Sequence, residues 1–323
     1  MKTEDALTTK DALQEKAYGA RAAARPRPSL RIRILDGELG GYVLLAPAII
    51  VLFLLTIWPL LYSIGISLTN YHLGSAAPVG FVGLTNFGRL LGDSIFLGSL
   101  LTTVELLALA IPLQLILGYI CARILQSTQG MRGSRVLRTF FIVPTMMTSL
   151  AVALFWTYIL DPLIGVANYL LSVLHLPAQP WLTSPGTAFF TLTGVYLWQW
   201  VPFTTILLLA GLLSIPQNIY EAAAVDGVRW YNRILSIDLP LLLRVGAIAA
   251  ILAVVEVIRM FDLVYGSTQG GPGTATLTNA VEIYRIGFEN FDTGYAAATS
   301  LVILVVTIIV AQVFVRVLRE EKA

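Results

Sequence analysis

The sequence predicts an all-α integral membrane protein with six transmembrane helices. Hydrophobic residues make up 57% of the 323 residues and charged residues only 12%, against about 25% charged residues in an average soluble protein. The mean hydropathy is +0.78. The apolar residues also gather in long runs, close to the roughly 20 residues that a helix needs to cross a bilayer. We therefore expect lipid to cover the apolar surface that a soluble fold could not bury.

The predicted transmembrane helices cover about residues 42–68, 95–125, 140–160, 188–213, 241–264 and 295–315. The first, third, fourth and sixth contain no charged residue, whereas the second carries one internal acid, Glu105. The fifth carries four charged residues: Arg244, Glu256, Arg259 and Asp262. Because charges inside a membrane are costly unless they face a partner or a wet cavity, the fifth helix is predicted to line a functional path.

The distribution of Lys and Arg predicts the orientation of these helices. Eighteen of the 21 basic residues lie before the first helix, in the connections between the second and third and between the fourth and fifth helices or in the helix ends that flank them (Arg123 and Arg244), or after the sixth helix. Basic residues mark cytoplasmic segments, so both termini are expected in the cytoplasm. Residues 1–40 are predicted to be a mobile cytoplasmic tail, and residues 41–323 the transmembrane domain. The connection between the third and fourth helices is expected to lie on the outer side and to contain a short amphipathic helix over residues 164–174.

The connection between the fourth and fifth helices carries several structural signals. We expect a cytoplasmic helix over about residues 215–235, because Pro216 suits the first turn of a helix. Gly227 interrupts the helical preference and indicates a bend or a close approach. Leu239 and Pro240 predict an extended step before the fifth helix, since proline disfavours the helical conformation of the residue before it.

Two interpretations of this connection remain open from its composition and shape. It could be an amphipathic helix on the inner leaflet, with Arg229 and Arg233 facing lipid phosphates. Its residues also fit the pattern E-A-A-x3-G-x9-I-x-L-P, which resembles the coupling motif of binding-protein-dependent ABC import permeases. The matching residues are Glu221, Ala222, Ala223, Gly227, Ile237, Leu239 and Pro240.

Two further stretches narrow the resemblance to one family. The outer loop with Gly270, Gly271 and Pro272 looks like that of maltose-type carbohydrate permeases, and the run FVGLTNF over residues 81–87 resembles the first outer loop of the same family. The resemblance implies the type I ABC importer permease fold and a multi-pass subunit of a sugar importer in the bacterial cytoplasmic (inner) membrane. The implied partners are a second similar permease, two ATPase subunits, a periplasmic or lipid-anchored solute-binding protein, a carbohydrate substrate and membrane lipid.

The resemblance also implies a division of labour between subunits. This chain has no G-x4-G-K-[ST] phosphate loop, so ATP and Mg are expected on the partner ATPase subunits and no cofactor on this chain. The helix with Glu221 would dock into the ATPase, with Glu221 contacting a basic group and the alanines allowing a close fit. One cysteine and two histidines provide no metal site. No enzyme motif occurs, and the net charge of +2 gives no reason to expect nucleic acid as a partner.

For the substrate, the resemblance implies contacts from the helix before the coupling motif and from the helix before Gly-Gly-Pro. The residues predicted in this way are Tyr196, Gln199, Trp200, Phe203, Ala253, Glu256, Val257, Arg259 and Met260. Packing or an aromatic interface belt could equally explain the rings, and Glu256 could pair with Arg259. Alternatively, Arg259 recognises a phosphate, sulfonate or carboxylate on a sugar.

Other kinds of transporter are alternatives to a sugar importer. An ABC importer for an amino acid or a polyol would share the coupling motif, but the Gly-Gly-Pro loop favours a sugar. An ion-coupled secondary transporter could also have several helices and intramembrane charges. Such a transporter would have no use for a motif that contacts an ATPase.

Overall fold

The computed structural model describes residues 38–128, 130–131 and 133–320. These residues form helices, and the one β-type pairing among them is an isolated bridge between Thr69 and Phe81. The chain divides into two compact units, residues 1–62 and 63–323, which are described separately. The predicted tail lies outside the described residues except for its last three positions.

The first unit consists of an apolar helix with one π-helical turn. It contains α3 (Glu38–Leu52), η1 (Phe53–Ile57) and the beginning of α4 (Trp58–Ser67). In η1 the Trp58 N–H donates to the carbonyl of Phe53, five residues earlier. Pro59 follows directly, and the wider turn accommodates a proline ring that would crowd a regular α-helix. The candidate membrane span Leu45–Ser67 corresponds to the predicted first helix.

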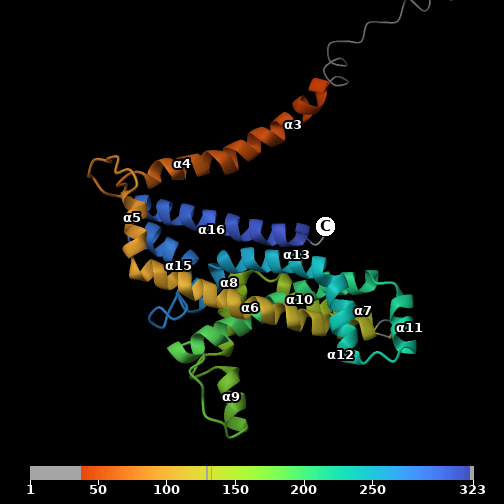
Figure 1. Cartoon of the computed structure of the whole chain (residues 1–323). Coiled ribbons are helices and arrows are strands. Elements are labelled where there is room, and N and C mark those ends of the chain that lie inside the picture. Colours follow the sequence, from red (N-terminus) through yellow and green to blue (C-terminus); the bar gives the residue numbers. More distant parts are fainter. Residues whose placement is uncertain (1–37, 129, 132, 321–323) are drawn as a thin grey trace, which may run out of the picture. The chain divides into compact units, whose positions relative to one another are not determined.

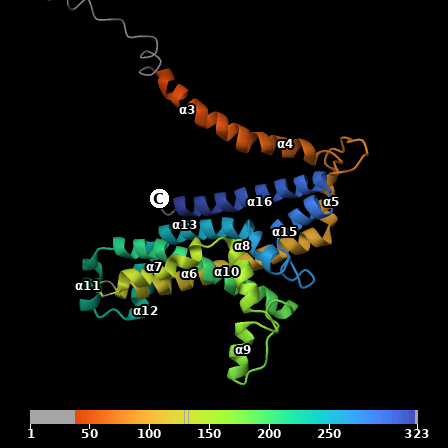
Figure 2. The same cartoon turned by 180° about the vertical axis from the view of Figure 1, so that it is seen from behind.

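The second unit is built on four long helices: α6 (Ser94–Ser127), α10 (Pro185–Ser214), α13 (Leu239–Ile258) and α16 (Thr293–Glu320). They run side by side, with α11 (Gln217–Val225) and α12 (Trp230–Arg233) at one end (Figures 1 and 2). The opposite end carries α5 (Thr85–Gly92) and α15 (Asn279–Tyr284). This arrangement separates the predicted coupling segment from the predicted outer loops.

Small residues allow the long helices of the second unit to approach closely. A Cβ on Gly118 of α6 would lie 2.7 Å from the methyl carbon of Thr204 in α10. A Cβ on Gly211 of α10 would lie 2.6 Å from a methyl carbon of Leu242 in α13. Membrane helices often pack in this way, because lipid provides no hydrophobic force that would drive larger side chains together.

Among the described residues, five helices are long and apolar enough to cross a membrane, or up to six if one bent pair is a single span. The bent pair is the predicted third helix, which the structure breaks into α7 (Ser134–Met146) and α8 (Ser149–Ile159) with a bend of 100°. Thr148 explains the second start, because its hydroxyl accepts a hydrogen bond from the Ala151 N–H and caps α8. The helix predicted over 140–160 is therefore interrupted at Met147 and Thr148.

The connection between α10 and α13 also differs from the expected boundaries. The helix expected over 215–235 ends at Val225, and a new helix begins at Trp230 and continues to Ile258. The expected extended step at Leu239 is wrong, because Leu239 is helical, with φ −62° and ψ −47°. The π-helical turn η2 (Ile234–Asp238) precedes Pro240 as η1 precedes Pro59, and it lets the helix continue through the proline.

The predicted fifth helix ends earlier than expected and is followed by a break. The predicted fifth helix extends to residue 264, whereas α13 ends at Ile258 and a separate helix, α14 (Asp262–Ser267), follows. The π-helical turn η3 (Arg285–Glu289) links α15 to the loop before α16. In the connection between the predicted third and fourth helices, α9 (Val166–Val173) confirms the short helix expected over 164–174.

Candidate functional site

The predicted coupling residues lie on and after α11, but they differ in exposure. Glu221 and Ala222 are exposed, whereas Ala223 is only 7% exposed and is covered by its own chain. Of the three motif residues on α11, only Glu221 and Ala222 are thus accessible to a partner. The sequence did not identify two apolar neighbours, Val225 and Trp230, which are 87% and 73% exposed. The exposed surface formed by Glu221, Ala222, Val225 and Trp230 is called the α11 surface below.

Gly227 ends α11 rather than bending it. Its φ is +67°, in the left-handed region, and no atom lies near the position of an added Cβ. The Gly227 N–H donates to the carbonyl of Ala224 at 3.2 Å, and the Val228 N–H donates to that of Ala223 at 3.0 Å. This pair of bonds is the Schellman motif, which glycine adopts without the steric cost of a side chain.

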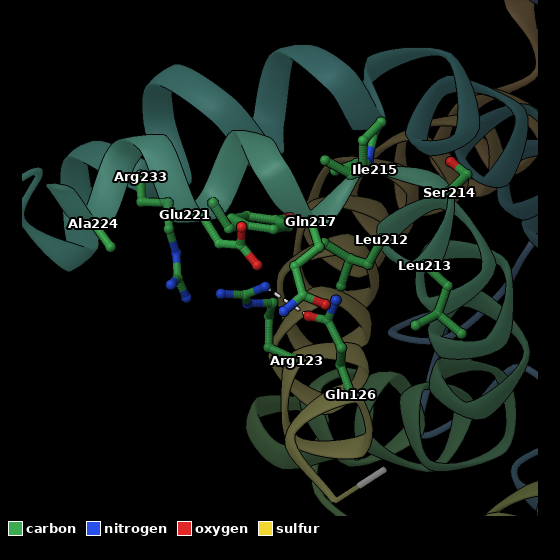
Figure 3. Close-up of a pocket in the computed structure, with 12 residues that line it drawn as sticks. Arg123, Gln126, Leu212, Leu213, Ser214, Ile215, Gln217, Glu221, Ala224 and Arg233 are labelled. Carbon is green, nitrogen blue, oxygen red and sulfur yellow. Dashed lines mark hydrogen bonds between the residues drawn. The ribbon is translucent and has the colours of Figure 1, made fainter. Parts of the chain in front are cut away.

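A cavity of about 690 Å³ opens beside α11. Figure 3 shows the side chains of Arg123 from α6, Glu221 from α11 and Arg233 from α12 pointing toward it. Arg123 donates from Nη1 to Oε1 of Gln126 at 2.6 Å. The guanidinium carbons of Arg123 and Arg233 lie 5.7 and 5.4 Å from the centre of the Tyr220 ring. The cavity is therefore lined by charged groups, and Glu221 belongs both to this lining and to the α11 surface.

A fully buried carboxylate lies behind this cavity. Asp238, the last residue of η2, is 0% exposed. It accepts hydrogen bonds from the hydroxyls of Tyr119 on α6, at 2.5 Å, and Tyr220 on α11, at 2.8 Å. The Arg123 Nε lies 3.6 Å from the same carboxylate. Burial and the hydrogen bond to Asp238 raise the pKa of Tyr220 to about 12, so this hydroxyl remains a donor at neutral pH.

The remaining residues of the motif lie around Asp238. Ile237 is half-buried, and Leu239 and Pro240 are exposed on the helix that leads into α13. Leu239 lines an apolar groove of about 260 Å³ with Leu242 and Gly246. The sequence analysis did not identify Asp238. The signal was present, because Asp238 is a charged residue among apolar ones at the variable position of I-x-L-P.

Six of the nine predicted substrate residues surround a second, smaller cavity of about 40 Å³: Tyr196, Gln199, Trp200, Glu256, Arg259 and Met260. The sequence did not identify Ser149, Phe261 and Leu263, which line it too. Phe203, Ala253 and Val257 lie outside this lining. Ala253 and Val257 are buried in helix packing, and the Phe203 ring packs edge-on against Trp200, with centroids 6.2 Å apart.

Two predicted polar residues are already engaged within the protein. The Tyr196 hydroxyl is buried and donates to Oε1 of Gln114 at 2.9 Å. Gln199 is 1% exposed, and its Nε2 donates to the Met147 carbonyl at 3.1 Å. Its Oε1 is buried without a hydrogen-bond partner among the described residues. Gln199 therefore keeps one buried acceptor that is unpaired among the described residues, whereas the Tyr196 hydroxyl is already paired with Gln114.

The charged side chains at the small cavity form no contact ion pair with one another among the described residues. Glu256 is half-buried on the last turn of α13, and Arg259 is exposed at the break after it. Asp262 begins α14 and is exposed. In the part of the chain that the structure describes, no ion pair within 4.0 Å joins Glu256 to Arg259. The ion pair that the sequence left open is thus not made at contact distance, and Arg259 is accessible at the cavity.

The predicted outer loop is closed by its own hydrogen bonds. Gly270 has φ +84°, and an added Cβ would lie 2.7 Å from a methyl carbon of Leu277. The Thr276 hydroxyl donates to the Gly271 carbonyl at 2.6 Å. The peptide bond between Gly271 and Pro272 is cis. The two glycines and the proline therefore define a compact turn.

Within the described ranges, no group of three or more His, Cys, Asp or Glu side chains could hold a metal ion.

Comparison with known proteins agrees with this architecture. The chain is 34% identical over 278 residues to the trehalose/maltose transport system permease protein MalF of Thermococcus litoralis, covering 86% of this chain and 92% of that one. It is 30% identical to the sulfoquinovosyl glycerol transport system permease protein SmoG of Agrobacterium fabrum, with 89% and 92% coverage. A bacterial ABC transporter that imports the acidic polysaccharide alginate has the same fold, with a TM-score of 0.76 at 21% identity over 89% of this chain and 98% of that one.

The family model described as "Binding-protein-dependent transport system inner membrane component" matches residues 114–320. The match contains α10, α11 and α13, and thus both the coupling motif and the small cavity. It confirms the family and the fold class that the sequence predicts. The chain therefore belongs to the family of binding-protein-dependent transport system inner membrane components.

Proposed function

We propose that this chain forms half of the translocation pathway of an ATP-driven importer for a sugar or sugar derivative, and that it contacts the ATPase through α11. Membership of its family makes the chain a multi-pass membrane transport subunit rather than an enzyme. The observation that carries the proposal is the exposure of Glu221 and Ala222 on a short helix between α10, which contributes Tyr196, Gln199 and Trp200 to the small cavity, and α13, which contributes Glu256.

The α11 surface has the chemistry of a protein docking site. Val225, three residues after Ala222 on α11, and Trp230, at the start of α12, add exposed apolar area, and Glu221 adds a charge. Buried aromatic anchors provide much of the binding energy of protein interfaces, whereas an exposed ion pair contributes only about 0–1 kcal/mol. The apolar fit would thus hold the ATPase, and Glu221 would orient it. The ATPase subunits would bind ATP and Mg on the cytoplasmic side, where both termini of this chain would also lie.

The small cavity supports a pathway shared between two permeases. Its volume of about 40 Å³ is far below the roughly 300–1,000 Å³ of a typical small-molecule site. One chain would therefore contribute one wall, and a second similar permease would contribute the other. The Gly270–Pro272 loop would lie on the outer side, where a solute-binding protein delivers the substrate.

The relatives and the cavity together favour a sugar substrate. The two relatives are named for trehalose/maltose and for sulfoquinovosyl glycerol. Trp200 and Phe261 offer rings, and the unpaired Oε1 of Gln199 offers an acceptor for a sugar hydroxyl. A binding screen of the cognate solute-binding protein tests the class. Binding of sugars and not of amino acids or polyols is expected, and selective binding of an amino acid or a polyol would overturn the sugar assignment.

Arg259 is expected to recognise a negative group on the substrate. A charge-assisted hydrogen bond contributes about 1.5–3 kcal/mol, so Arg259→Ala should reduce uptake of an anionic sugar about 10- to 100-fold. Uptake of radiolabelled anionic and neutral sugars into proteoliposomes measures the effect. Arg316→Ala, an exposed arginine near the end of α16, is the matched control. Unchanged uptake of the anionic sugar by Arg259→Ala would exclude this role.

A further inference from the structure

We infer that Asp238 is the positioning residue that fastens α11 to α6 and α13, so that a displacement of α11 moves both long helices together. The inference rests on the proposed function, in which the ATPase moves α11. It adds a specific mechanical connection that the seven motif residues do not include. The connection consists of Asp238, Tyr119, Tyr220 and Arg123 and is called the Asp238 cluster below.

The peptide chain alone is a compliant link between α11 and the long helix that follows. Four residues, 226–229, separate the end of α11 from the start of α12. One of them is Gly227, which has positive φ and no neighbour at the position of an added Cβ. A helix joined only through such a segment can pivot on it, because glycine has wide conformational freedom. A second connection is needed if α11 and α13 are to move as one body.

The Asp238 cluster provides that second connection. Tyr220 lies in the middle of α11, and its hydroxyl donates to Oδ1 of Asp238. Tyr119 of α6 donates to Oδ2 of the same carboxylate. One buried side chain thus joins three helical segments that lie far apart in the sequence. Hydrogen bonds to a buried charge are about twice as strong as neutral ones, and breaking such a network leaves its remaining members unpaired.

The buried charge is compensated on the side of the large cavity. Arg123 lies 3.6 Å from Asp238 through Nε, and its guanidinium also lines the cavity beside Glu221. A buried carboxylate without such a partner would be strongly destabilised. Replacement by asparagine would keep the shape but remove the charge that Arg123 and both hydroxyls recognise. The negative charge, rather than the size of the side chain, is therefore the feature that the cluster requires.

The position of Asp238 lets it act on the small cavity from a distance. Asp238 directly precedes α13, whose 20 residues end next to Arg259. A helix of this length spans about 30 Å and behaves as a stiff rod. A displacement applied at Asp238 would consequently reach Glu256 and Arg259, while Tyr119 would pass the same displacement to α6. Rigid-body movement of packed helices is a common form of switching in transport proteins.

The test compares uptake with ATP hydrolysis in the complete reconstituted complex. Asp238→Asn should lower the number of substrate molecules taken up per ATP hydrolysed by about tenfold, as expected when a strongly coupled buried network is broken, while the complex still assembles and hydrolyses ATP. Tyr220→Phe removes only the hydroxyl that joins α11 to Asp238 and should lower the same ratio severalfold. Tyr169→Phe, an exposed tyrosine on α9, is the matched control and should leave the ratio unchanged.

The outcomes separate this inference from the proposed function. A purely structural role would reduce the amount of assembled complex and would leave the ratio of uptake to hydrolysis unchanged. If Asp238→Asn does not assemble, Tyr220→Phe decides, because it removes one oxygen atom and leaves the buried ion pair intact. An unchanged ratio in Tyr220→Phe would overturn the inference. Normal assembly and uptake after replacement of Ala222 by aspartate would instead overturn the role of α11 itself.

Discussion

Replacing Ala222 with aspartate is expected to abolish substrate uptake, because the permease no longer holds its ATPase. Ala222 is exposed on α11 between Glu221 and the apolar side chains of the α11 surface. A carboxylate placed there would lose water on docking without gaining a partner, at a cost of several kcal/mol. Each 1.4 kcal/mol reduces affinity about tenfold, so little complex should remain. Co-purification of the ATPase with the permease measures the loss directly.

Two variants make the result for Ala222 specific. Ala178→Asp changes an exposed alanine in the connection before α10 and should leave co-purification unchanged. Ala223→Asp should additionally destabilise α11, because Ala223 is buried within its own chain and a buried carboxylate without a partner is costly. Wild-type amounts of bound ATPase in Ala222→Asp would show that the α11 surface does not face the motor.

Replacing Gly227 with proline should also reduce uptake to background, through the loss of the α11 C-terminus. Proline requires φ near −65°, whereas Gly227 has φ +67° and donates its N–H to Ala224. Proline would thus remove both the positive φ and the N–H donor that the Schellman motif needs at this position. Asparagine tolerates positive φ, and alanine costs about 1–2 kcal/mol there. The expected order of uptake is therefore wild type, Gly227→Asn, Gly227→Ala and Gly227→Pro, measured in proteoliposomes at equal protein content.

Gly74 offers a matched control for the backbone effect. It also has positive φ, +78°, and no atom near an added Cβ. Gly74→Ala should thus impose a similar conformational cost in a loop away from α11, and uptake should remain close to wild type. Equal loss of uptake in Gly74→Ala and Gly227→Ala would show that strain, rather than the position of α11, limits transport.

The long helices could be predicted from the sequence because their signal is local. The fourth predicted helix, 188–213, lies within α10 (Pro185–Ser214), and the second, 95–125, lies within α6 (Ser94–Ser127). Both are apolar runs of transmembrane length, so hydropathy alone locates them. The boundary at Trp230 could not be found in this way. The π-helical turn before Pro240 lets a helix pass a residue that normally ends one.

The sites were predictable only in part, because their decisive contacts are distant in the sequence. Four of the six substrate candidates at the small cavity lie on α10 and α13, and the other two directly follow α13, so their meeting follows from local helix signals. Ser149, in contrast, reaches the cavity from α8, after the break at Thr148. The Asp238 cluster joins residues 119 and 238, and no local pattern predicts that contact. The engagement of the Tyr196 hydroxyl by Gln114 is a contact of the same kind.

We propose that ATP hydrolysis by a partner subunit drives sugar import through this chain by way of α11. The most direct measurement is sugar uptake into proteoliposomes that contain this chain, the second permease and the ATPase, with and without ATP and the solute-binding protein. Uptake should require both and should vanish with a hydrolysis-deficient ATPase. Uptake by this chain without the ATPase, driven by an ion gradient, would contradict the claim and would indicate a secondary transporter instead.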